Sequence, residues 1–233
     1  MASSTVASRT PRPRHTVDND DAVMARALAF STWARNNARV ILYTAAAVLL
    51  AAGAALYVRY YRAERQAAAA TDFMEVQQKV TTEATPQAVK DLNAFIGKHD
   101  GTNEADEARL ALAELHLRGN DAKAALPPLR EVAGRSGSPL SIQGGMMLAA
   151  AQAQAGDLAA AEKTYLDTGD RGTLDFQRME AWNEAALLRE QAGNWKGAAE
   201  LYEKMVPLTD KGSLERSITE MRLAEARGHA AGK

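Results

Sequence analysis

The four histidines are the side chains best suited to catalysis or metal binding, but they lie far apart in the sequence, at His15, His99, His116 and His229. None of them has the spacing to another histidine, or to a pair of carboxylates, that a metal site requires. The chain also has no cysteine, which excludes thiolate zinc sites, iron–sulfur clusters and a cysteine nucleophile. No serine, histidine and aspartate stand out as a catalytic triad. We therefore predict a protein without a metal, a cofactor or enzymatic activity.

Phosphate loops and nucleic-acid sites find no support in the sequence either. The pair Gly144-Gly145 lies inside a helical pattern with no strand before it, so we interpret both glycines as points where helices pack closely. The chain has 28 basic and 29 acidic residues, interspersed, and a net charge of −1. Nucleic-acid binding requires a concentrated basic surface, so we expect no nucleic-acid partner.

One segment has the length and composition of a transmembrane helix. Residues 40–58 carry no charge and are bracketed by Arg39 and Arg59. As a helix they would extend over roughly 28 Å, close to the thickness of the hydrocarbon core of a bilayer. Tyrosines follow the segment and Trp33 precedes it, as is typical of membrane interfaces. A cleaved signal peptide and the buried helix of a soluble protein are the alternatives, but the apolar run is long and 39 residues precede it.

The segments on either side of this span differ in composition. Residues 1–20 are rich in Ser, Thr, Pro and Arg, which predicts a disordered tail. Residues 21–39 form either an amphipathic juxtamembrane segment or a solvated approach to the span. Residues 59–84 include a run of alanines and predict an exit helix that continues the span. Six arginines before the span weakly favour a cytoplasmic N-terminus, because further basic residues follow it.

Residues 85–233 contain a repeat. Gly119, Gly156 and Gly193 are spaced 37 residues apart, each between a longer and a shorter helical stretch. An Ala-x-x-x-Tyr pair follows the second and third glycines, as Ala161/Tyr165 and Ala198/Tyr202, and Trp182 lies in the preceding stretch of the third unit. These features resemble the tetratricopeptide repeat, with Pro128 at the aromatic position of a degenerate first unit. We predict an all-α fold: one N-terminal transmembrane helix, then a tetratricopeptide-like helical-repeat superhelix that ends in a capping helix at 213–226.

The resemblance also implies a binding surface. Tetratricopeptide-like arrays bind partners on the concave face formed by the first helix of each unit. The residues that we expect there are Arg109, His116, Met146, Gln154, Asn183, Leu187 and Glu190. This set lacks the Lys and Asn arrangement with which some such domains bind a C-terminal carboxylate.

The region around the span allows a narrower comparison. The stretches W-A-R-N-N-A-R, Y-V-R-Y-Y-R and A-A-A-A-T-D-F, followed by helical repeats, resemble the ancillary SecYEG translocon subunit family. That resemblance implies a bacterial inner-membrane protein with a cytoplasmic N-terminus and periplasmic repeats. Its partners would be the translocon, chaperones and unfolded exported clients. The alternatives are an accessory or assembly scaffold subunit of another large membrane complex, and a tethered adaptor in the cytosol.

Overall fold

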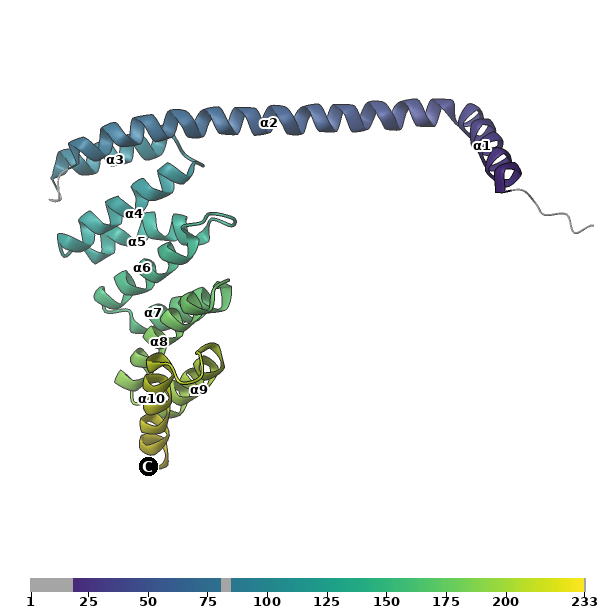
Figure 1. Cartoon of the computed structure of the whole chain (residues 1–233). Helices are drawn as coiled ribbons and strands as arrows, with labels where there is room; N and C mark the ends of the chain where they lie inside the picture. The colour runs from purple at the N-terminus through teal and green to yellow at the C-terminus, as the bar shows by residue number, and fades with distance from the viewer. Residues whose placement is uncertain (1–18, 81–84, 233) are drawn as a thin grey trace, which may run out of the picture. The chain divides into compact units, whose positions relative to one another are not determined.

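The computed structural model describes residues 19–80 and 85–232, and the predicted tail at 1–20 lies almost entirely outside them. The described part is all-α, as predicted (Figure 1). Its helices are α1 (Asn19–Asn36), α2 (Ala38–Lys79), α3 (Pro86–Lys98), α4 (Asn103–Arg118), α5 (Ala122–Gly134), α6 (Ser141–Gln154), α7 (Leu158–Arg171), α8 (Asp175–Gln191), α9 (Trp195–Met205), the short 3-10 helix η1 (Val206–Leu208) and α10 (Leu214–Ala231). The chain divides into two units, Met1–Tyr61 and Arg62–Lys233.

The first unit consists of α1 and the beginning of α2. Every side chain from Val40 to Val58 is exposed in the structure, although most are apolar. Among the described residues, α2 is the one helix that is long and apolar enough to cross a membrane. In α1, Leu28 and Phe30 lie two residues apart and therefore on nearly opposite sides of the helix. Leu28 and Phe30 therefore do not share one face, and the amphipathic segment predicted for residues 21–39 stays a prediction.

The second unit begins inside α2. Ala69 and Phe73 of α2 are buried against α3 and α4, where they meet Leu92 and Phe95. The ring centroids of Phe73 and Phe95 are 5.3 Å apart. Helix α3 begins as predicted, with Pro86 in its first turn and the Thr85 hydroxyl accepting a hydrogen bond from the backbone N–H of Ala88. The predicted exit helix therefore contributes directly to the core of the repeat domain.

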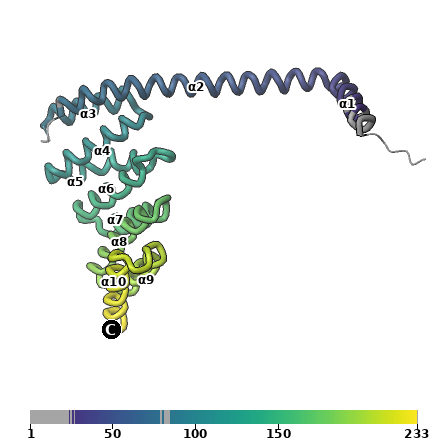
Figure 2. Tube along the Cα trace, in the orientation of Figure 1, coloured from purple at the N-terminus to yellow at the C-terminus, as the bar shows by residue number. Residues whose placement is uncertain are grey.

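From α3 onwards each helix packs mainly on the next helix in the chain, as Figure 1 and Figure 2 show. The buried side chains form three clusters that follow one another along the sequence. Since a single helix pair cannot bury its apolar face alone, each pair depends on its neighbours for a core. This arrangement confirms the predicted tetratricopeptide-like array.

The turns inside the three helix pairs correct one detail of the predicted repeat. Asn120, Gly156 and Gly193 have positive φ angles of 58°, 88° and 72°, and each precedes the residue that caps the next helix. Asn120, not Gly119, is thus equivalent to the later glycines, because asparagine also tolerates the left-handed conformation. The shift places the fully buried Leu129 at the aromatic position, so the assignment of Pro128 to that position was wrong.

The glycine pair in α6 lies at two close helix contacts. A Cβ atom on Gly144 would lie 2.7 Å from Val132 Cγ1 in α5, and one on Gly145 would lie 2.4 Å from Thr168 Oγ1 in α7. Both distances are shorter than side-chain packing permits. The interpretation of these glycines as close-packing positions is therefore confirmed.

Candidate protein-binding groove

The last helix, α10, has a buried stripe and an exposed apolar stripe that face different ways. Its first turn is fixed by Ser213, whose hydroxyl accepts a hydrogen bond from the backbone N–H of Arg216. Positions 219, 223 and 226 are buried against the repeat core. Leu214, Ile218 and Met221 repeat the same i, i+4, i+7 spacing on another face, and they are 76%, 42% and 62% exposed. A helix that only capped the array would have a polar outer face, so this second stripe requires another explanation.

A groove of 630 Å³ lies beside this stripe. Helices α8 and α10 form most of its walls, and α9 contributes one residue. The lining residues are Phe176, Met179, Glu180, Asn183, Met205, Leu214, Glu215, Ile218 and Thr219. Phe176 is 62% exposed, so an aromatic ring and two residues of the stripe, Leu214 and Ile218, are accessible from solvent at this groove. Large apolar side chains gathered at an accessible groove are typical of surfaces that bind other proteins.

The charges in the groove are all of one sign. Glu180 and Glu215 are its two charged lining residues, and both are acidic. Acidic residues of α8 also raise the pKa of Tyr165, which is buried in the neighbouring core. Burial, together with the negative charges of Glu184 and Glu180, raises the pKa of Tyr165 to about 12, so the phenol is neutral at physiological pH. The groove is therefore apolar with acidic residues in its walls.

The residues predicted for the concave surface have different environments. Asn183 lines the groove, and Gln154 is exposed and donates a hydrogen bond to the side-chain oxygen of Asn120. Glu190 accepts a 2.9 Å hydrogen bond from the Tyr202 hydroxyl, whose pKa is raised mainly by burial. The remaining half-buried members of the set are His116, Met146 and Leu187. Of the predicted residues, Asn183 is thus the one that the structure places in the groove.

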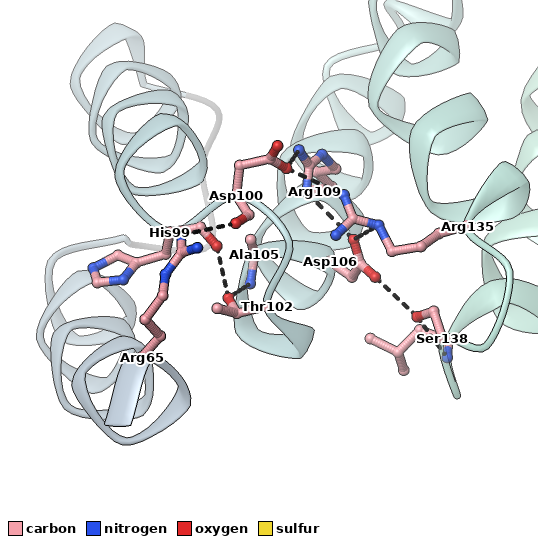
Figure 3. A network of polar contacts seen from close by, with 10 residues as sticks. Arg65, His99, Asp100, Thr102, Ala105, Asp106, Arg109, Arg135 and Ser138 are labelled. Atoms are coloured by element: carbon pink, nitrogen blue, oxygen red, sulfur yellow. Dashed lines mark hydrogen bonds and ion pairs between the residues drawn. The ribbon is translucent and has the colours of Figure 1, made fainter. Parts of the chain in front are cut away.

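Arg109 lies in the packed interior rather than on an open face, since only 7% of its surface is exposed. Its guanidinium group is 2.6 Å from Asp100 and 3.3 Å from the fully buried Asp106 (Figure 3). Arg135 pairs with the same two carboxylates, at 3.1 Å and 3.2 Å. The Ser138 hydroxyl donates a 2.8 Å hydrogen bond to Asp106. Two arginines and two aspartates therefore connect α4 to the turn before it and to the α5–α6 loop.

This network lowers the pKa of one of its carboxylates, Asp100. Hydrogen bonds from Arg109, and next from Arg135, hold the pKa of Asp100 below its ordinary value. Asp100 is consequently ionised throughout the physiological pH range. Its charge, with that of Asp106, balances the two guanidinium groups and makes the network a structural element.

Two residues of the groove that the prediction missed, Leu214 and Ile218, had a recognisable signal, which Met221 beside the groove shares. Leu214, Ile218 and Met221 fit the apolar positions of a capping helix, but their spacing coincides with that of the buried positions five residues further on. One helix cannot direct both stripes into the same core, because the stripes differ in direction. Within residues 19–80 and 85–232, no three histidine, aspartate or glutamate side chains converge on a possible metal position.

The comparisons with known proteins agree with this architecture. Residues 31–225, well over half of the chain, match the family described as tetratricopeptide repeat-like domain. A comparison with curated proteins found no match. The matched range begins before the apolar part of α2 and ends inside α10, and so includes the helices of the groove. The chain therefore belongs to the tetratricopeptide repeat-like domain family.

Proposed function

We propose that this protein is a membrane-anchored protein-interaction module. Residues 40–58 of α2 cross a bilayer, and the repeat domain binds a protein partner in the groove between α8 and α10. The exposed stripe Leu214, Ile218 and Met221 on the last helix is the observation that carries this proposal. Exposed apolar side chains on a helix whose other face is already buried gain stability only by covering with a partner.

The chemistry of the groove defines the kind of partner. Its apolar residues fit a segment with large apolar side chains at helical or extended spacing. Glu180 and Glu215 favour a segment in which lysine or arginine flanks those side chains.

The sequence around the span supports a more specific role. Its resemblance to the ancillary SecYEG translocon subunit family supports a bacterial inner-membrane protein that associates with the translocon and assists exported proteins. The six arginines before the span support a cytoplasmic N-terminus, and hence periplasmic repeats. Under this proposal the partners are membrane subunits of the translocon, its chaperones and exported clients.

Co-purification from a mild detergent tests the proposed function. We expect the full chain to retain translocon subunits and the Ile218→Asp variant to lose them, because a charge would enter the apolar groove. Leu158→Asp is the matched control, since Leu158 is 41% exposed on α7 and does not line the groove. Retention of the same partners by Ile218→Asp would contradict the groove. Recovery of a different membrane complex would keep the interaction module and replace the translocon with that complex.

The orientation has its own test. Lys211 is exposed in the loop before α10, whereas the neighbouring Ser213 is needed as a helix cap. Because the chain has no cysteine, Lys211→Cys introduces a unique thiol. A membrane-impermeant thiol reagent should label it in intact spheroplasts if the repeats are periplasmic. Labelling that requires lysis would place the repeats in the cytoplasm.

A further inference from the structure

A second recess, distinct from the α8–α10 groove, lies where α2 passes the α3–α4 turn and the α5–α6 loop. It has a volume of 390 Å³. Its lining residues are polar or glycine: Arg62, Arg65, Gln66, Gly101, Thr102, Asn103, Arg135, Ser136, Gly137 and Ser138. The charged residues in this lining are all arginines, and no carboxylate is among them. We refer to this site as the arginine recess.

The three arginines come from two separate parts of the second unit. Figure 3 shows Arg65 on α2 and Arg135 on the α5–α6 loop, with Thr102 of the α3–α4 turn between them. Arg135 is held in place by Asp100 and Asp106, and Arg65 donates a 3.2 Å hydrogen bond to the backbone carbonyl of Asp100. Arg62 makes no ion pair or hydrogen bond with any residue that the structure describes. Guanidinium groups on an accessible recess, beside hydroxyl and amide groups and the first turn of α4, are donors suited to a phosphate group.

The position of Arg62 in α2 indicates where such a phosphate would come from. Arg62 follows Val58, the last residue of the proposed span, by four residues of the same helix. Four residues advance the helix by about 6 Å, and the headgroup layer on each side of the hydrocarbon core is about 5–8 Å thick. Tyr60 and Tyr61 lie within one turn of Arg62 in the same helix and have the amphipathic character of interface residues. Arg62 would therefore lie at the depth of the lipid phosphates.

We propose that the arginine recess binds a phosphate-bearing anion, namely the headgroup of an anionic phospholipid, through Arg62, Arg65 and Arg135. The lipid assignment rests on the proposed membrane span, whereas the phosphate chemistry rests on the recess alone. A bound headgroup would hold the first repeats at the membrane surface. The free energy of binding this headgroup would add to the general electrostatic attraction between basic juxtamembrane residues and anionic lipid.

The test uses the full chain in detergent, with thermal unfolding followed by tryptophan fluorescence. Short-chain phosphatidylglycerol should raise the unfolding temperature of the wild type more than phosphatidylcholine does. Arg62→Gln and Arg65→Gln should weaken the apparent affinity for phosphatidylglycerol at least about tenfold, because each removes charge-assisted hydrogen bonds. Arg59→Gln is the matched control, since Arg59 is an exposed arginine one turn earlier that does not line the recess. A second titration uses inorganic phosphate.

The outcomes separate the possible sources of the anion. Stabilisation by phosphatidylglycerol that depends on Arg62 and Arg65 but not on Arg59 supports the proposal. Stabilisation by inorganic phosphate alone, with the same dependence, would overturn the assignment to lipid and keep a phosphate site. Equal behaviour of all three variants and the wild type in both titrations would overturn the site altogether. Extraction of the wild type from membranes by alkaline carbonate would contradict the proposed span. If the chain resists extraction but its stabilisation by phosphatidylglycerol does not depend on Arg62, only the proposed recess is contradicted.

Discussion

Leu129 and Pro128 are neighbours in α5, but they contribute differently to the repeat. Leu129 is fully buried and Pro128 is half-buried. Leu129→Ala should therefore lower the free energy of unfolding by about 2–5 kcal/mol, through lost burial and the cavity that remains. Pro128→Ala should leave stability unchanged or raise it, since proline inside a helix removes a backbone hydrogen bond. Denaturant unfolding measures both, and a larger loss for Pro128→Ala would contradict the placement of Leu129 at the aromatic position.

Asp100 makes the stability of the repeat domain depend on acid pH. Its folded pKa lies below the ordinary value of 3.8, so its ion pairs stabilise the fold above that pH and lose their effect as the pH falls through the folded pKa. Asp100→Asn should lower the melting temperature at pH 7 and flatten its decline below about pH 4. The exposed loop residue Asp210 provides the control variant Asp210→Asn. An unchanged acid limb in Asp100→Asn would show that these ion pairs have no net effect.

Single residues are also where the sequence was least informative. The turn at Asn120 is easily misassigned because Gly119 stands beside it, and only the backbone angles show which residue adopts the left-handed conformation. Arg109 fits a surface pattern along α4, yet its partner Asp100 precedes the helix and Arg135 belongs to a later loop. Contacts between elements of this kind cannot be inferred from the periodicity of one helix. Tyr165 and Tyr202, in contrast, belong to the repeat motif that the sequence revealed, and both are buried.

At the scale of elements, the contact between α5 and α6 depends on Gly144. A Cβ atom there would lie 3.0 Å from the backbone nitrogen of Ala133 as well as against Val132, so the helices would have to move apart. Gly144→Ala should therefore lower the free energy of unfolding by about 1–3 kcal/mol. In α3, a Cβ atom on Gly97 would have no neighbouring atom within 4 Å. Gly97→Ala should therefore raise the free energy of unfolding by about 0.5–1 kcal/mol. Thermal unfolding of the two variants should therefore shift in opposite directions, and shifts of the same sign would contradict the close packing.

The end of α2 is the second element with a specific expectation. Phe73 is buried against α3, whereas the next residue, Met74, is 64% exposed. Phe73→Ala should cost about 3–5 kcal/mol of unfolding free energy, and Met74→Ala should remain within about 0.5 kcal/mol. Denaturant unfolding of the full chain in detergent gives both values. Similar, small effects of the two substitutions would show that the repeat domain does not need the exit helix.

The helices themselves were largely predictable, because the residues that begin and end them act locally. Thr85-Pro86, the Gly-Asp and Gly-Asn turns and the alanine-rich stretches all act within a few residues. The boundary of the repeat domain was less visible. A start at residue 85 follows the break in the helical pattern, but the burial of Ala69 and Phe73 depends on α3 and α4 folding back onto α2.

At the scale of the whole molecule, the chain combines a tetratricopeptide repeat-like domain, a type of domain that binds other proteins, with one described helix, α2, that is long and apolar enough to cross a membrane. The sequence predicted this combination from one apolar run and one repeat. It did not predict the accessible groove beside α10, because the exposed stripe on α10 resembles a core face until the buried stripe is seen to fill that role. The groove thus required the structure.

Site-specific photocrosslinking in intact cells tests the central claim most directly. A photoreactive amino acid at Ile218 should form a discrete adduct with a partner protein, because Ile218 lines the groove and is accessible. The same amino acid at Leu158, which is exposed to a similar degree on α7 but lies outside the groove, should form no such adduct. Absence of an adduct at Ile218, or the same adduct at both positions, would contradict a protein-binding groove between α8 and α10.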